Sequence, residues 1–386
     1  MVKIKTQPLI LHASIGYGHT KTANVLANEI DRLTHYKSEV MDLFDSLPVW
    51  QQRMIRKGYF NMISTTPVLW DICYRYTSKS KKGDRLFESL ARNLFHSVGH
   101  KILESRRPFI LSTHVLITRL LATWIKWSTK NIPLYHISTD FKLHRLAIHP
   151  QVSGYFLSGL EPVFSHMDVP SSFHSYGIPI ECSTGRPANK EMEKERLGLP
   201  KGKLVIMIAG GGEGIARYEE IIHAFKHMSQ VHILCFTGMN QRVPLKLKHV
   251  ENSQNVKVIP FTNEFSTYVG ASDVLITKAG GLTLAHAITE TTPIVIYQPL
   301  PGQEWENALL LHEKNAAILA LNKAQLHKAV HTVLFNQKER SAYLKQANVL
   351  GKPNATNHII QQVILETHGH EPLCAHVDAE SIAEYL

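Results

Sequence analysis

The sequence predicts an α/β protein made of two domains, each with a parallel β-sheet that carries helices on both faces. Short apolar runs with the length and β-branched composition of strands recur along the chain, and helical patterns separate them. A glycine-rich or polar loop follows nearly every run. The length of 386 residues also suits two domains. Because ligands of open α/β sheets bind beyond the carboxyl ends of the strands, we expect the two domains to face each other across a cleft lined by these loops.

The first domain is expected over residues 1–185. Its first strand leads into the loop Gly16-Tyr17-Gly18-His19 and a helix that starts at Thr20. The loop matches neither a dinucleotide fingerprint nor a Walker loop, so neither kind of site is predicted. His19 stands at the helix start, where its titration range suits proton transfer, although a capping or packing histidine would give the same pattern. The strands expected here are Pro8–His12, Glu39–Phe44, Pro108–Thr113, Pro133–Thr139, Gly154–Ser158 and Ser175–Ile178.

Polar residues follow two of these strands. Ser112-Thr113-His114 ends the third strand, and Asp140 and His144 come after the fourth. Strand ends of this kind meet the cleft, which makes these side chains candidates for the site. Taken alone, Asp140 and His144 are more typical of a turn carboxylate and a surface imidazole.

The second domain is expected over residues 186–355, after a polar linker with a short helix, and a C-terminal helix and polar tail over 356–386. The loops Gly210–Gly214, Lys278–Gly281 and Pro301–Glu304 follow strands and precede helices. Helices that begin after such loops present free N–H groups and a positive dipole end, which favour phosphate. The sequence therefore predicts a nucleotide or phosphate site here. The strands expected are Leu204–Ile208, His232–Phe236, Val256–Pro260, Val274–Thr277 and Pro293–Gln298.

The charge of the chain favours anionic partners. The formal net charge is +10 and the pI is near 9.3, which suits acidic lipid surfaces, nucleic acid or phosphorylated substrates. Between Trp50 and Arg85, aromatic residues alternate with basic ones, a composition suited to the headgroup layer of an anionic membrane. An ordinary helical hairpin with a solvated basic face is the alternative. No nucleic-acid motif accompanies the segment, so nucleic acid is not expected as a partner. The segment contains Trp50, Tyr59, Phe60, Trp70, Tyr74 and Tyr76, with Arg53, Arg56, Lys57, Arg75, Lys79, Lys81, Lys82 and Arg85.

The cysteines and the hydropathy pattern indicate a cytoplasmic protein. Four scattered cysteines without a CxxC motif fit a reducing compartment. No secretory signal and no apolar stretch of about 20 residues is present, so any membrane contact is expected to be peripheral. His368, His370, Cys374 and His376 could ligate zinc by type, but their spacing matches no standard finger, and no metal site is expected.

Seven motifs, in order and over nearly the whole chain, resemble those of one family, the GT-B glycosyltransferases of the monogalactosyldiacylglycerol synthase and processive diacylglycerol glucosyltransferase group. The resemblance implies a GT-B fold of two Rossmann-like domains. The motifs are Ser14–Ala23, Ser112-Thr113-His114, Thr139–His144, Tyr176–Ile180, Gly210–Gly214, Thr277–Thr283 and Pro301–Ala308.

The resemblance also implies the activity. The first domain would hold a diacylglycerol-type lipid at the inner face of the cell membrane, and the second a UDP-sugar. His19 would be the base, with Asp140 as a second base candidate or an orienting group, while Gly16, Gly18, His114 and His144 would belong to the acceptor side. Transfer would be inverting and, since no DxD motif is present, independent of a metal or other cofactor. The donor would contact Gly211, Gly212, Phe261, Lys278, Gly280, Gly281, Thr283, His286, Gln303, Glu304 and Asn307.

Two departures from the family pattern stand out. His286 replaces a glutamate that commonly grips the nucleotide ribose, so donor affinity could fall or another nucleotide could be preferred. Leu146-Ala147 replaces a tryptophan on the acceptor side. A diverged paralogue that binds nucleotide sugar without catalysis, and a sugar-nucleotide epimerase of the same fold, are therefore the alternative hypotheses.

Overall fold

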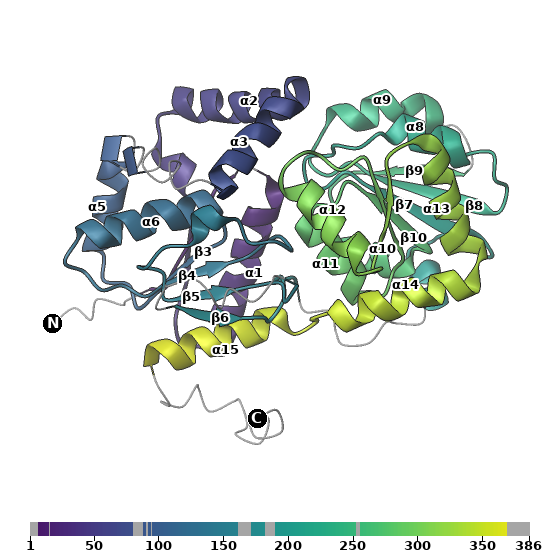
Figure 1. Cartoon of the computed structure of the whole chain (residues 1–386). Helices are drawn as coiled ribbons and strands as arrows, with labels where there is room; N and C mark the ends of the chain where they lie inside the picture. Colours follow the sequence, from purple (N-terminus) through teal and green to yellow (C-terminus); the bar gives the residue numbers. More distant parts are fainter. Residues whose placement is uncertain are drawn as a thin grey trace, which may run out of the picture.

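The computed structural model describes residues 7–14, 16–79, 88–89, 92–93, 95–160, 171–181, 190–251 and 255–368. These residues form two α/β lobes that lie side by side (Figure 1). Each lobe contains a six-stranded sheet in which all paired strands run parallel. The strand order is β2-β1-β3-β4-β5-β6 in the N-terminal lobe and β12-β11-β10-β7-β8-β9 in the C-terminal lobe. The predicted architecture of two parallel-sheet domains is confirmed.

The N-terminal lobe alternates short buried strands with helices, as the apolar runs predict. Its helix α1 buries Ala23, Leu26, Ala27 and Ile30, the apolar face expected from the sequence. The elements are β1 (Leu9–His12), α1 (Tyr17–Leu33), β2 (Glu39–Asp42), the 3-10 helix η1 (Leu43–Ser46), α2 (Val49–Thr65), α3 (Pro67–Lys79), α5 (His96–Glu104), β3 (Ile110–Ser112), α6 (Val115–Trp127), β4 (Leu134–Ile137), the 3-10 helix η2 (Arg145–Ala147), β5 (Gly154–Phe156) and β6 (Ser172–His174).

The C-terminal lobe repeats the pattern, and its central strands are buried along almost their whole length. The elements are α7 (Lys190–Arg196), β7 (Leu204–Ala209), α8 (Tyr218–Phe225), β8 (Val231–Phe236), α9 (Arg242–Glu251), β9 (Val256–Ile259), α10 (Phe265–Ala271), β10 (Val274–Thr277), α11 (Gly281–Thr289), β11 (Ile294–Tyr297), α12 (Gln303–Glu313), β12 (Ile318–Ala320), α13 (Lys323–Phe335), α14 (Gln337–Leu350) and α15 (Ala355–His368).

The structure corrects one expected strand and adds another. The last strand of the first sheet, β6, lies at Ser172–His174 and pairs with β5, whereas residues 175–178 form no strand. Gly177 has a φ of 100°, a conformation that interrupts an extended run. Ile178 and Ile180 pack into the core of the C-terminal lobe, so the hydrophobicity that suggested a strand serves the contact between the lobes. The short strand β12, which the sequence did not reveal, pairs with β11 at the edge of the second sheet.

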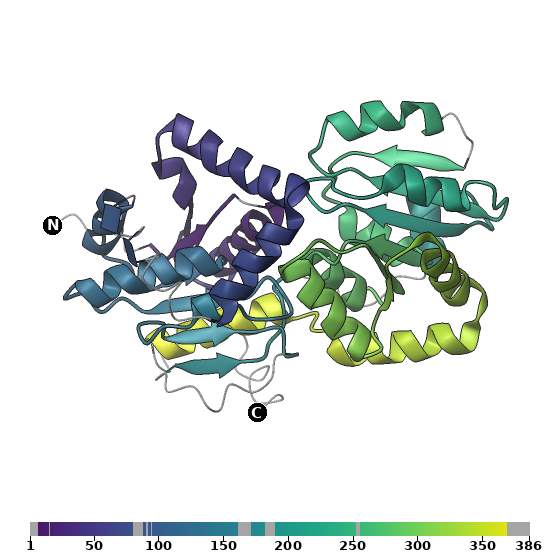
Figure 2. The ribbon, with the colours of Figure 1, turned by 45° about the horizontal axis from the view of Figure 1, so that its top comes forward.

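The helix α15 leaves the C-terminal lobe and packs on the N-terminal one. Figure 2 shows this helix, in yellow, running beneath the first sheet. Its residues Ile359, Ile360, Val363 and Ile364 belong to the same apolar cluster as Leu26 of α1. The chain therefore crosses between the lobes twice, and its C-terminal helix completes the core of the lobe in which the chain begins.

The packing of α15 predicts that two side-chain truncations in this helix will lower the free energy of unfolding by different amounts. Ile360 is fully buried, whereas the Leu365 side chain is 44% exposed. We expect Ile360→Ala to lower the free energy of unfolding by about 2–5 kcal/mol, because it leaves a cavity in the N-terminal core. Leu365→Ala is the control and should cost well under half as much. Urea unfolding of the full chain measures both, and equal effects would contradict the packing.

Candidate active site

A cavity of about 240 Å³ lies between the lobes and receives the loops at the carboxyl ends of both sheets. Most of the residues predicted for the site line it, whereas His114, His144 and Asn307 are not among its lining residues. The predicted residues that line it are Gly16, Gly18, His19, Asp140, Gly211, Gly212, Phe261, Lys278, Gly280, Gly281, Thr283, His286, Gln303 and Glu304.

His19 lies in the first turn of α1, at the end of the cavity formed by the N-terminal lobe. Its Nδ1 is 2.6 Å from the carbonyl oxygen of Thr113 and 3.2 Å from Oγ1 of Thr139. A carbonyl oxygen can only accept, so Nδ1 carries the proton and Nε2 keeps its lone pair. Burial lowers the pKa of His19 to about 4, and the hydrogen bond to Thr113 opposes this shift. The imidazole is therefore neutral at physiological pH, the state that a general base requires.

Four further histidines form a cluster with His19, and burial lowers the pKa of each of them. The ring of His114 packs edge-on against His19 at 4.5 Å between centroids, and its Nδ1 accepts from the amide of Leu116. His136 lies 2.7 Å from Oγ1 of Thr118, and its pKa falls to about 3. His144 packs under Tyr74 of α3, and its pKa falls to about 4. His12 on β1 completes the cluster. His114 and His144 thus support the wall of the site instead of forming its surface.

Asp140 is hydrogen-bonded to the opposite lobe. Its Oδ1 accepts from Nδ2 of Asn307 at 2.9 Å, and its Oδ2 accepts from Nε2 of Gln303 at 3.3 Å. Burial raises the pKa of Asp140, an effect that the hydrogen bond from Asn307 and the charge of Lys278 oppose. Asn307 is fully buried, and its amide also binds the backbone of Phe141 and of Ala279. The contact of Asn307 with the donor remains a prediction; in the structure this residue ties the loop after β4 to α12.

The glycine loop before α11 allows the lobes to approach closely. A Cβ atom added at Gly281 would lie 1.9 Å from the carbonyl oxygen of Thr139, a distance at which no side chain fits. The first amides of α11 therefore open onto the cavity next to the His19 side, as expected of an anion site. Lys278 precedes this loop, and its Nζ is 2.5 Å from Oε1 of Glu304 on α12. Burial raises the pKa of Glu304, while Lys278 opposes the shift.

An aromatic contact closes another part of the cavity. Tyr17 of α1 packs edge-on against Phe261, which follows β9, with 5.2 Å between ring centroids. Tyr17 also lies against Gly212, where an added Cβ would come within 2.2 Å of the tyrosine Cβ. The sequence predicted Phe261 and Gly212 as site residues and missed Tyr17, although it stands between the two loop glycines.

The structure adds three further residues that the sequence reasoning did not assign to the site. Trp70 of α3 donates from Nε1 to the carbonyl oxygen of Pro301 at 3.2 Å, so this helix reaches the loop before α12. Lys21 and Glu181 line the cavity and form an ion pair with each other. A signal for Trp70 was present in the aromatic segment. Nothing in the sequence indicated that Lys21 and Glu181, 160 positions apart, would meet.

Comparisons with known proteins agree with this geometry. Residues 19–180 match the family model of monogalactosyldiacylglycerol (MGDG) synthase, and residues 205–362 match that of the glycosyltransferase family 28 C-terminal domain. The two models together cover most of the chain. The chain is therefore a glycosyltransferase whose two halves match these two family models. The prediction of a glycosyltransferase, made from the seven motifs, is confirmed.

Relatives and structural neighbours extend over nearly the whole chain. A processive diacylglycerol beta-glucosyltransferase of Bacillus licheniformis is 23% identical over 92% of this chain and 94% of its own length. The protein of the same name from Bacillus cytotoxicus is 24% identical over 97% and 98%. Among solved structures, Acinetobacter baumannii MurG aligns with a TM-score of 0.57 at 14% identity, covering 93% of this chain and 99% of MurG. Phytolacca americana UGT2, complexed with UDP-2-fluoro-glucose and pterostilbene, aligns with a TM-score of 0.62 at 12% identity, covering 94% and 100%. These structures confirm the GT-B fold.

Two further features concern membranes and metals. In the described part of the chain, no helix combines the length and hydrophobicity that a membrane span requires. Within the same ranges, no three His, Cys, Asp or Glu side chains converge as metal ligands would. His370, Cys374 and His376 of the tail, and the side chain of His368, lie outside the described residues.

The buried histidines predict that the protein loses stability in mild acid. Their folded pKa values lie below the ordinary value of 6.5, so the unfolded chain binds more protons between about pH 4 and 6.5, and stability falls as the pH drops through this window. His136→Asn should reduce the slope of the unfolding free energy between pH 5 and 6 by about 1.4 kcal/mol per pH unit. Urea unfolding at several pH values measures this slope. His223→Asn, at an exposed position of α8, is the control, and an unchanged slope in His136→Asn would refute the account.

Proposed function

We propose that this glycosyltransferase moves a hexosyl group from a UDP-sugar to a diacylglycerol-type lipid, with inversion at the sugar carbon and without a metal. The observation that carries the proposal is the cavity itself. A neutral histidine of the N-terminal lobe lines the same cavity as a glycine loop and helix N-terminus of the C-terminal lobe, and its Nε2 has no hydrogen-bond partner among the described residues. The names of the Bacillus relatives and the synthase model support the lipid acceptor.

The donor is proposed to lie along the C-terminal lobe. Its diphosphate occupies the N-terminus of α11 beside Gly281, where free amides and the helix dipole favour negative charge. The uracil lies against Phe261, whose ring is held by Tyr17. The hexose points toward Gln303 and Glu304, both of which line the cavity. In this arrangement the hexose and the acceptor hydroxyl meet beside His19.

The proposed reaction is a single displacement. The acceptor hydroxyl oxygen attacks C1 of the hexose, the bond from C1 to the diphosphate oxygen breaks, and the hydroxyl proton passes to Nε2 of His19. Attack opposite the leaving group inverts the configuration at C1. The Thr113 carbonyl, bound to Nδ1–H, orients the ring and stabilises the imidazolium that forms. Asp140 keeps Gln303 and Asn307 in place across the cleft and so aligns the two substrates.

The protein itself offers groups that neutralise the leaving diphosphate. The amides at the start of α11 and the backbone of the Gly211-Gly212 loop can donate hydrogen bonds to phosphate oxygens. Lys278 adds a cation, balanced in this structure by Glu304. These groups support transfer without a divalent metal or other cofactor.

A turnover experiment tests the proposal. Purified protein mixed with anionic vesicles that contain diacylglycerol should release UDP from UDP-glucose or UDP-galactose. His19→Ala should lower the rate by at least about 100-fold, because it removes the base. His223→Ala, at an exposed site on α8, is the matched control and should retain the rate. Mass spectrometry of the lipid extract identifies the product.

Other outcomes separate the alternatives. No turnover with a panel of nucleotide sugars and lipid acceptors would overturn the proposal. If calorimetry then showed tight binding of UDP-sugar, the chain would be a nucleotide-sugar-binding paralogue, the reading that His286 motivates. Conversion of the donor without any acceptor would instead indicate an epimerase.

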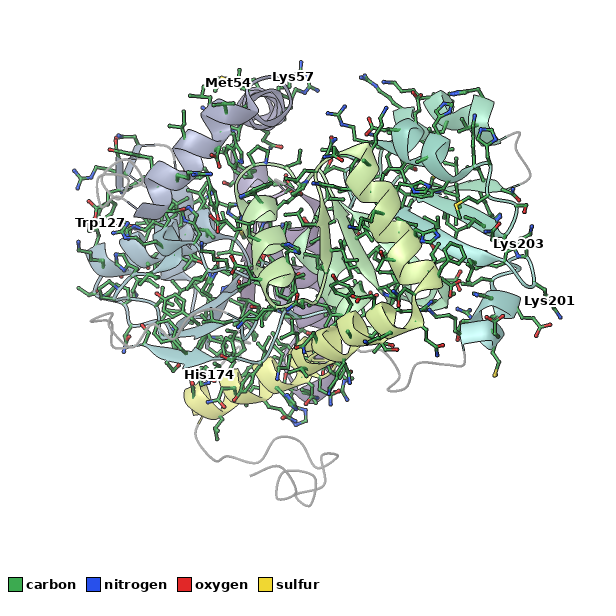
Figure 3. The ribbon with its side chains drawn as sticks, turned by 45° about the vertical axis from the view of Figure 1, so that its right-hand side comes forward. Met54, Lys57, Trp127, His174, Lys201 and Lys203 are labelled. Carbon is green, nitrogen blue, oxygen red and sulfur yellow. The ribbon has the colours of Figure 1, made fainter. Side chains whose placement is uncertain are left out.

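The proposed membrane contact is an apolar–basic surface on α2 and α3. Trp50 and Val68 are 63% and 72% exposed, values unusual for large apolar residues. Met54 and Lys57 lie on the outer side of α2, away from both sheets (Figure 3). The surface consists of Val49, Trp50, Met54, Val68, Leu69, Ile72 and Tyr76 with the exposed basic residues Arg53, Lys57 and Arg75. The side chains of Arg56, Tyr59, Phe60 and Lys79, and residues Lys81, Lys82 and Arg85, lie outside the described part of the chain.

This surface is joined to the cavity through α3. On α3, the side chains of Leu69, Ile72 and Tyr76 are exposed. From the same helix, Trp70 binds the Pro301 carbonyl and Tyr74 packs on His144. A lipid leaving an anionic monolayer would therefore enter beside a helix that contacts both lobes. We propose that the protein binds peripherally, at the inner face of the cell membrane, with the apolar residues among the headgroups and the basic ones on lipid phosphates.

Charge placed on this surface should separate membrane binding from folding. We expect Trp50→Glu/Val68→Glu to lower the fraction that sediments with phosphatidylglycerol vesicles at least about 10-fold, because it removes apolar insertion and adds repulsion. Val349→Glu is the control, since Val349 is 70% exposed on α14, in the other lobe. Sedimentation of the double variant equal to that of wild type would refute this docking surface.

A further inference from the structure

His286, which lines the cavity, has an imidazole nitrogen without a hydrogen-bond partner among the described residues. His286 on α11 is 6% exposed and lines the cavity, and its Nδ1 is a buried polar atom without a hydrogen-bond partner in the described structure. Its ring is held edge-on by Phe265 at 5.6 Å. A buried polar atom without a partner is costly, so this nitrogen points to a ligand group that completes it.

A carboxylate and an ammonium group line the same cavity as this histidine. Glu181, on the segment that leaves β6 toward the C-terminal lobe, and Lys21, on α1, both line the cavity and pair with each other. Burial lowers the pKa of His286 to about 4, while Glu181 raises it and Lys21 lowers it, so both charges lie within electrostatic reach of the ring. Side chains from α1, the crossover segment and α11 thus line the same cavity.

The position of His286 along α11 indicates which part of the donor it would meet. Phosphate at the helix N-terminus lies beside Gly281, and His286 is five residues farther on, about 7 Å along the axis. The ribose of a nucleoside diphosphate is attached directly to the phosphate. The ribose therefore lies beside this turn of α11 when the uracil extends toward Phe261. A vicinal diol offers two O–H donors, and a carboxylate beside a neutral imidazole offers the matching acceptors.

We propose that Glu181 supplies the carboxylate that receives the ribose hydroxyls of the donor, with His286 completing the contact and Lys21 positioning Glu181. This inference rests on the proposed function, in which the donor is a nucleoside diphosphate sugar. The ion pair with Lys21 uses Oε1 of Glu181, and the carboxylate retains Oε2 for a hydroxyl. Glu181 and Lys21 belong to the N-terminal lobe and His286 to the C-terminal lobe. Ribose recognition therefore requires both lobes, and donor binding favours the closed arrangement seen here.

Calorimetry with two nucleotides tests this assignment on the full chain. UDP and 2′,3′-dideoxy-UDP are titrated into wild type and Glu181→Gln. Glu181→Gln should raise the Kd for UDP about 10-fold, the effect of losing one hydrogen bond to a charged group, and leave the Kd for the dideoxy compound unchanged. Adding His286→Glu to Glu181→Gln places a carboxylate on the opposite side and should restore most of the affinity for UDP. Glu195→Gln, at an exposed ion pair on α7, is the control.

Each other result is decisive. If Glu181→Gln binds UDP as wild type does, or weakens both nucleotides equally, the carboxylate does not receive the ribose, and the inference fails while the proposed transfer stands. If wild type discriminates between the nucleotides through Glu181 but transfers no sugar, the inference holds and the proposed reaction fails. If wild type binds no uridine nucleotide, both fail.

Discussion

The arrangement of this enzyme depends on one buried amide. Asn307 accepts from the Phe141 amide at 2.8 Å and donates to Asp140 and to the Ala279 carbonyl, which satisfies its oxygen and both of its N–H groups. These three partners come from both lobes, so breaking the contact would leave polar groups buried and unpaired. Beside this contact, Gly281 approaches the carbonyl oxygen of Thr139 so closely that no side chain would fit. Through it, the loop that carries Asp140 and the helix that carries Gln303 keep a fixed distance, which sets the width of the cavity.

The close approach of the two lobes also determines the chemical environment of His19. Packing the lobes together removes water around His19, and the loss of solvation keeps its imidazole neutral. The helix N-terminus on the opposite side favours negative charge. One constraint therefore leaves a neutral imidazole on one wall of the cavity and a helix N-terminus on the other, as the proposed reaction requires. The buried histidines near His19 are expected to make the N-terminal lobe lose stability in acid.

The N-terminal lobe is held together by distant parts of the chain. The helix α15 returns from the C-terminal lobe and covers one face of the first sheet, while α2 and α3 stand above the opposite end with their apolar residues exposed (Figure 1). Trp70 connects that exposed region to the Pro301 loop. The helix α3 thus links the exposed apolar surface to the Pro301 loop at the cavity, the connection on which the proposed membrane contact depends.

The sequence by itself determined the two parallel sheets, the loops that meet in the cavity and the identity of His19, because strand periodicity and glycine loops are local properties of the chain. The sequence predicted the last strand of the first sheet a few residues beyond its true position. Ile178 and Ile180 are hydrophobic because they pack against the C-terminal lobe, and no local sequence pattern reveals such a contact. The sequence also predicts His114 and His144 on the acceptor side and Asn307 at the donor. These roles remain predictions, and none of the three residues lines the cavity. Only the tertiary structure decided that α15 packs on the first lobe, that Lys21 pairs with Glu181 and that His286 lines the same cavity. Contacts between residues more than a hundred positions apart depend on how the chain folds back on itself.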